Sequence, residues 1–69
     1  MKAFSGKELG RVLARHGWKL VRVHGSHHIY GRPGSIVRLS VPVHGNISLK
    51  RGLLKHLVKM AGLKETDLG

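Results

Sequence analysis

The spacing of apolar residues predicts a helix near the start of the chain. Ser5 followed by Glu8 is typical of a capping box, in which each residue satisfies a free backbone donor of the other. Gly17 then provides a common C-terminal stop, so we expect the helix from about Ser5 to His16. The residues that recur at helical spacing and should form its buried stripe are Leu9, Val12 and Leu13.

Three short runs rich in β-branched residues follow this helix and predict three strands. They are Trp18–His24, His27–Arg32 and Ile36–Val43, and a tight Gly25-Ser26 connection separates the first two. Short connections favour antiparallel neighbours, so the three runs should form one meander. In the third run the residues expected on the buried face are Val37, Leu39, Val41 and Val43.

A second apolar stripe predicts a closing helix, capped by Ser48 and ending near Ala61 before Gly62. The predicted order is therefore α-β-β-β-α, an α+β fold in which both helices cover one face of a three-stranded antiparallel sheet. This order is that of a double-stranded-RNA-binding-like fold. The stripe consists of Leu49, Leu53, Leu57, Met60 and Ala61, widened by Leu54 and Val58.

Composition narrows the class of protein. Sixty-nine residues make a single domain spanning 1–69, and the absence of cysteine excludes disulfides and thiolate metal sites. Thirteen Lys and Arg against three acids give a formal charge of +10, which indicates a polyanionic partner, with nucleic acid first. We see neither a signal peptide nor a run long enough to span a bilayer, so we expect a cytoplasmic protein without membrane contact.

The segment "VHGSHHIYGR" carries the candidate chemistry. Alternation along the strand puts His28 and Tyr30 on one face and Ile29 on the other. If Ile29 points to the core, the other two point to the open face of the sheet, where a substrate can lie. Nearby cations favour the neutral imidazole, which can deprotonate a ribose 2′-OH while Lys or Arg stabilises the phosphate. A solvated surface histidine without a function is the other interpretation of His28.

Other chemistries fit the sequence less well. His27 and His28 are neighbours on a strand and face opposite ways, so they do not readily chelate one ion, and neither helix carries H-x-x-x-H. We therefore expect neither a metal nor another cofactor. Ser26 is close to His28, but no acid lies nearby to orient the imidazole as a Ser-His-acid hydrolase requires.

Two further groups of residues are candidates for RNA contact. Tyr30 can stack on a base or hydrogen-bond a phosphate, whereas Phe4 and Trp18 are more typical of a core. Lys50, Arg51 and Lys55 fall in the first turns of the closing helix, where the helix dipole also attracts phosphate. The basic row of the first helix, which we expect to lie on a solvated face, consists of Lys7, Arg11 and Arg15.

Taken together, these segments resemble the HicA toxin family of small bacterial mRNA interferases. "SGKELGRVLARHGWKLVRVHGSHHIY" is similar to the family's opening helix, first strand and G-S-x-H element, and "VPVHGNISLKRGLLKHLVKMAGL" to its third strand and closing helix. The resemblance implies that His28 is the catalytic base, that Gly25 and Ser26 form the turn that presents it, and that His27 occupies a variable position.

The resemblance also implies a metal-independent endoribonuclease that cleaves mRNA, arrests growth and is neutralised by a HicB-type antitoxin covering the active site. We expect the free toxin to be a monomer. The proton donor for the leaving oxygen stays open between His44 and water. The alternative function is a non-catalytic RNA-binding module that uses the same basic surface.

Overall fold

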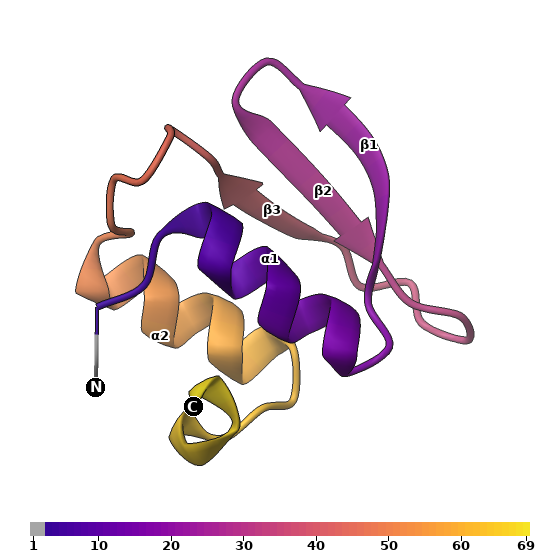
Figure 1. Cartoon of the computed structure of the whole chain (residues 1–69). Coiled ribbons are helices and arrows are strands. Elements are labelled where there is room, and N and C mark those ends of the chain that lie inside the picture. The colour runs from indigo at the N-terminus through magenta and orange to yellow at the C-terminus, as the bar shows by residue number, and fades with distance from the viewer. Residues whose placement is uncertain (1–2) are drawn as a thin grey trace.

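The computed structural model describes residues 3–69 as a three-stranded antiparallel sheet, in the order β1-β2-β3, with two helices and a short 3-10 turn (Figure 1). The predicted α-β-β-β-α order is confirmed, and residues 1 and 2 of the predicted domain lie outside the described part. No pattern in the sequence predicted the closing 3-10 helix. The elements are α1 (Gly6–Arg15), β1 (Lys19–His24), β2 (His27–Gly31), β3 (Leu39–Pro42), α2 (Arg51–Met60) and η1 (Glu65–Leu68).

The predicted capping box begins α1. The Ser5 hydroxyl accepts a hydrogen bond from the Glu8 backbone N–H at 3.1 Å, and the Glu8 carboxylate accepts one from the Ser5 N–H at 2.9 Å. Gly17 follows the helix with φ +89°, a conformation that glycine adopts without a steric penalty. Local sequence signals are therefore sufficient to set both ends of α1.

One core lies between the helices and the sheet. Leu39 and Val41 of β3 are fully buried, and both helices contact this strand. Phe4 and Trp18 belong to the core, as predicted. The remaining members of the core are Leu9, Val12, Leu13, Leu54, Leu57, Val58, Ala61 and Leu68.

The third strand is shorter than predicted, because β3 begins at Leu39 rather than Ile36. The Ser35 hydroxyl accepts the Val37 N–H at 3.0 Å, and the Arg38 guanidinium donates to the carbonyls of Ser35 and Val37 at 3.2 and 3.0 Å. Such side-chain bonds to nearby backbone compete with ladder pairing. Residues 35–38 are consequently held in a loop, and Ile36 is almost completely exposed.

The closing helix begins at Arg51 with Lys50 as its N-cap, so the prediction that Ser48 caps it was wrong. Ser48 instead forms an isolated antiparallel bridge with Ser5, and the Leu49 N–H donates to the Phe4 carbonyl at 2.7 Å. This long-range pairing holds the backbone extended at residues 48 and 49. It also joins the segments that lead into the two helices.

The pairing of β2 with β3 reverses the predicted orientation of the central strand. His28 lies opposite Val41 and Tyr30 opposite Leu39, whereas Ile29 lies opposite the exposed Ser40. Directly opposed residues share a face of the sheet. His28 and Tyr30 are therefore on the core side, and Ile29 is on the open face. Isoleucine usually prefers a buried position. Here Leu39 and Val41 of β3 are fully buried, so their partners lie on the core side and Ile29, between these partners, is left on the open face.

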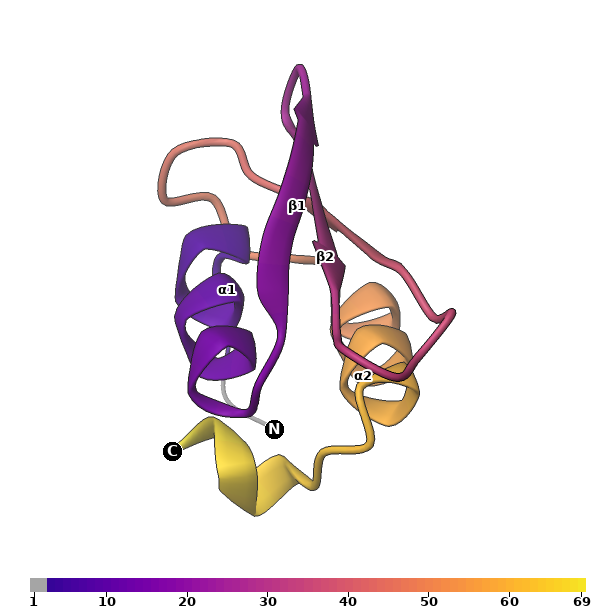
Figure 2. The ribbon, with the colours of Figure 1, turned by 90° about the vertical axis from the view of Figure 1, so that its right-hand side faces the viewer.

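Two glycines allow α1 to approach the sheet closely (Figure 2, where the β1–β2 hairpin is seen nearly edge-on with α1 against one side). A Cβ atom built at Gly6 would overlap the Pro42 carbonyl oxygen, and one built at Gly10 would overlap the Tyr30 hydroxyl. Gly6 and Gly10 lie one turn apart on the same side of the helix. Their missing side chains leave the space that Pro42 and Tyr30 occupy.

We predict that Gly6→Ala lowers the free energy of unfolding by about 1–3 kcal/mol, because the added methyl group meets backbone that cannot move independently. Gly52→Ala is the matched control, since a Cβ there has no atom within 4 Å and alanine favours the helix. Chemical denaturation of both variants measures the difference. Equal stability of the two variants would show that α1 does not approach the sheet this closely.

Candidate active site

A cleft of about 580 Å³ lies along the junction of α1 with the β1–β2 hairpin. One wall comes from α1 and the other mainly from Leu20, His28 and Tyr30, which face the core side of the sheet. His28 and Tyr30, the two residues singled out in the sequence, both line this cleft. The lining residues are Lys7, Gly10, Arg11, Ala14, Trp18, Lys19, Leu20, His28, Tyr30 and Val43.

His28 is half-buried at the wall of the cleft, so a ligand has access to its ring. Within residues 3–69 its side chain makes no hydrogen bond, which leaves both ring nitrogens available to a ligand. Its cross-strand partners Val23 and Val41 fix its place in the sheet. An accessible imidazole on a paired central strand is a well-positioned acceptor or donor of a proton.

The turn that leads into His28 is built as the sequence suggested. Gly25 has φ +56°, which a two-residue hairpin requires at this position and which glycine supplies readily. The Ser26 carbonyl accepts the Val43 N–H at 2.7 Å, so the turn is tied to the end of β3. Gly25 and Ser26 lie outside the cleft lining and contribute by holding the backbone just before His28.

Tyr30 extends across the cleft to α1. Its hydroxyl lies against Gly10, in the space that a side chain at position 10 would fill. Burial raises the pKa of the Tyr30 phenol above its usual value of 10.0, because the charged phenolate loses solvation. The hydroxyl therefore stays protonated at neutral pH and can donate a hydrogen bond to an anionic ligand.

Three cations line the same cleft as the imidazole. Lys7 and Arg11 reach the cleft from α1, and Lys19 reaches it from β1. None of the three acids in the chain lines the cleft. Cations that line one cleft, with no acid among its lining residues, create a positive potential that attracts a phosphate group.

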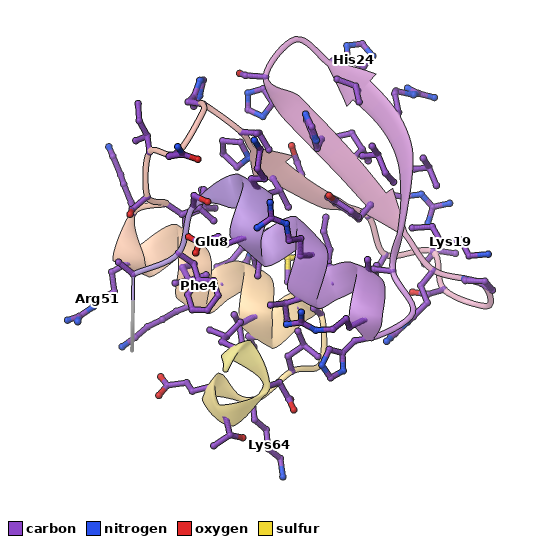
Figure 3. The ribbon with its side chains drawn as sticks, viewed as in Figure 1. Phe4, Glu8, Lys19, His24, Arg51 and Lys64 are labelled. Carbon is purple, nitrogen blue, oxygen red and sulfur yellow. The ribbon has the colours of Figure 1, made fainter. Side chains whose placement is uncertain are left out.

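The sequence pointed to a different set of cations. Lys50, Arg51 and Lys55 are exposed at the start of α2, and none of them lines the cleft. Figure 3 shows Arg51 on the opposite side of the molecule from Lys19. Whether these three residues contact RNA stays a prediction.

From the sequence, Lys7 and Arg11 are expected on a solvated face. Both residues are exposed, but both also line the cleft. Their four-residue spacing did show that they share a side of α1. The spacing did not show that this side of α1 lines the same cleft as His28. No pattern in the sequence indicated that Lys19 also lines it.

Trp18 closes the cleft where α1 meets β1. Its ring is buried, and the Arg32 guanidinium lies 4.5 Å from the ring centroid. This stacking is a cation–π contact, which fixes Arg32 beside the tryptophan. The indole Nε1–H makes no hydrogen bond with any atom of residues 3–69.

The other histidines do not join His28. His44 is exposed after the end of β3 and does not line the cleft. His27 lies on the open face, where its Nδ1 is 3.3 Å from the Ser40 hydroxyl. Across residues 3–69, no three or more His, Cys, Asp or Glu side chains are grouped so as to hold a metal ion.

The fold and the cleft define a small α+β protein with an accessible histidine in a cationic site. A family model described as "HicA toxin of bacterial toxin-antitoxin" matches residues 6–63. The chain therefore belongs to the HicA family of bacterial toxins, as the sequence predicted. No curated protein was matched. No helix within residues 3–69 has the length and apolar character needed to cross a membrane.

We predict that the phenol titrates above pH 10 and that Gly10→Ala brings its pKa back towards 10. The added methyl group would displace the hydroxyl from its place against α1 and expose it. Tyr30 is the only tyrosine in the chain, so phenolate absorbance reports it directly. Identical titration curves for wild type and Gly10→Ala would argue against this contact.

The raised pKa also predicts how stability depends on pH. The folded state holds the phenol proton more tightly than the unfolded state, so its contribution is complete below pH 10 and is lost as pH rises through the folded pKa. Melting temperature should fall over this range in wild type and fall less in Tyr30→Phe. Because Tyr30→Phe keeps the aromatic ring and removes only the hydroxyl, the difference in pH dependence between the two proteins reports the titration of the phenol and not a loss of packing.

Proposed function

We propose that this HicA-family chain is an endoribonuclease that cleaves mRNA, with His28 as the general base. One observation carries the proposal: an accessible imidazole shares a cleft with three cations and no acid. Family membership supports a toxin role. The volume of about 580 Å³ is within the range of clefts that hold small ligands, so part of an RNA strand fits it.

The reaction needs only one proton acceptor beside a held phosphate. A neutral ring nitrogen of His28 takes the proton of a ribose 2′-OH, and the 2′-oxygen attacks the adjacent phosphorus. The bond to the 5′-oxygen breaks, and that oxygen takes up a proton. The products are a 2′,3′-cyclic phosphate and a free 5′-hydroxyl.

The cleft supplies stabilisation where negative charge develops. Lys7, Arg11 and Lys19 can contact non-bridging phosphate oxygens, and Tyr30 can donate a hydrogen bond to one of them. His44 does not line the cleft, which favours water over His44 as the proton donor for the leaving oxygen. Because no step calls for a metal, we propose that cleavage is metal-independent.

The proposed partner is a HicB-type antitoxin that covers this cleft. An inhibitor must exclude RNA from His28, and the surrounding cations favour acidic side chains on its surface. The proposed setting is the cytoplasm, where mRNA and an antitoxin are both present. The free toxin is proposed to act as a monomer, because the cleft is formed within one chain.

We predict that His28→Ala reduces cleavage of single-stranded RNA by about 10²–10⁴-fold, the usual contribution of a general base. His27→Ala is the matched control, because this neighbouring histidine faces away from the cleft and should leave cleavage unchanged. RNA affinity and circular dichroism of both variants should match wild type. Gel analysis of a labelled RNA measures cleavage.

The same cleavage assay tests whether the 2′-OH is the nucleophile and whether cleavage needs a metal ion. An RNA with a 2′-deoxy sugar at the cleavage site should be resistant, since the nucleophile is missing, and EDTA should have no effect. Full cleavage by His28→Ala would remove the histidine from its role. Binding of RNA without cleavage by the wild type would favour the non-catalytic module.

We predict that Lys7→Gln with Arg11→Gln lowers the rate of cleavage at saturating RNA by at least about tenfold, since their contacts are made with the reacting phosphate. Lys50→Gln with Arg51→Gln removes the same charge outside the cleft. This second pair should weaken RNA binding at most, without lowering the saturated rate. The opposite result would move the phosphate site to α2.

A further inference from the structure

The face of the sheet away from the core carries a second group of basic side chains. Because Arg22 lies opposite Ile29 and His24 opposite His27, all four share this face. Arg22, His24 and His27 are exposed, and Ile29 is half-buried. His24 projects near the tip of the hairpin (Figure 3).

A groove of about 500 Å³ is hollowed into this face. Its lining combines the cations Arg22 and Arg38 with the apolar side chains of Val21 and Ile29, and His24 completes it. The register of β1 shifts between Leu20 and Arg22, which makes Val21 the extra residue of a bulge. Alternation from Leu20, which lies opposite Tyr30 on the core side, already places Val21 on the open face, and the bulge places Arg22 on this face as well.

Arg38 is held in place before any ligand arrives. One of its terminal nitrogens, Nη1, donates to the carbonyls of Ser35 and Val37 at 3.2 and 3.0 Å. Its guanidinium also lies over Gly31, where a Cβ would be 3.1 Å from the central carbon. The N–H groups on the other two nitrogens remain for a ligand. A fixed guanidinium loses less conformational freedom when it binds an anion.

We infer that this groove is a second RNA contact, which holds a nucleotide flanking the cleavage site by its phosphate and its base. Arg22 and Arg38 contact the backbone phosphate, and the base packs on Ile29 and Val21. The inference rests on the proposed RNA substrate. It assigns to the open face a role separate from that of the cleft.

The position of the groove fits one RNA strand that passes both sites. His28 and Tyr30 face the cleft while Ile29, between them, faces the groove, so only the sheet separates the two. Strand β1 is an edge of the sheet, so RNA can pass around it without crossing another strand. Lys19 on this strand lines the cleft and Arg22 lines the groove.

Charge favours RNA over an acidic protein as the occupant. No acid lies on the open face, because Glu8 caps α1 while Glu65 and Asp67 lie in η1. The groove offers arginine beside an apolar floor, which suits a phosphate with an attached base. A protein strand that extended the sheet would pair with the free edge of β1, whereas the groove lies on the open face of the sheet.

The test measures RNA binding in a His28→Ala background, so that cleavage does not interfere. Fluorescence anisotropy with a single-stranded RNA is recorded at several salt concentrations. Arg22→Gln with Arg38→Gln should weaken binding and reduce the slope of log affinity against log salt by about 0.7, the value for one neutralised phosphate of a single strand. Ile29→Ala should weaken binding without changing the slope.

The control is Arg15→Gln with Lys59→Gln, which removes the same charge from exposed helix positions outside both sites. This pair should leave the slope nearly unchanged. A groove variant with the same affinity and slope as the control would overturn the inference. Cleavage by the protein with His28 intact is measured separately, and its absence would count against the proposed function without affecting this comparison.

Discussion

Gly6 and Gly10 let α1 lie against the sheet at a separation that a side chain at either position would prevent. This close approach affects the candidate active site as well as the packing of the core. The same turns of the helix that carry these glycines also carry Lys7 and Arg11, so the close approach brings two cations to the wall opposite His28. If α1 were further away, the core would lose contacts and the histidine would lose its cationic surroundings.

A domain of 69 residues has little room for a deep active site, and this one is formed at the junction of a helix and a hairpin. The chemistry proposed for it suits that limit. General base catalysis on RNA requires a positioned imidazole and a few cations, and the nucleophile belongs to the substrate. Because none of the three acids lines the cleft, the positive charges of Lys7, Arg11 and Lys19 are not neutralised there.

Local signals were reliable for α1 and for the hairpin. A capping box and glycine turns depend on neighbours in the sequence, so Ser5, Glu8 and Gly25 could be interpreted without the fold. Apart from the face of β2, the predictions that were wrong concern residues whose backbone is engaged elsewhere. Ser48 pairs with a distant residue instead of capping a helix, and residues 35–38 are held by side-chain bonds that shorten β3.

The sequence by itself determined the order of the elements, the strong positive charge, the family and the choice of His28 as the candidate base. Only the tertiary structure decided which face this histidine occupies and which cations stand beside it. The physical reason is that alternation along a strand defines two faces without saying which one is covered. That choice was made by the pairing of His28 with Val41 and by the packing of α1, both of which join residues far apart in the chain.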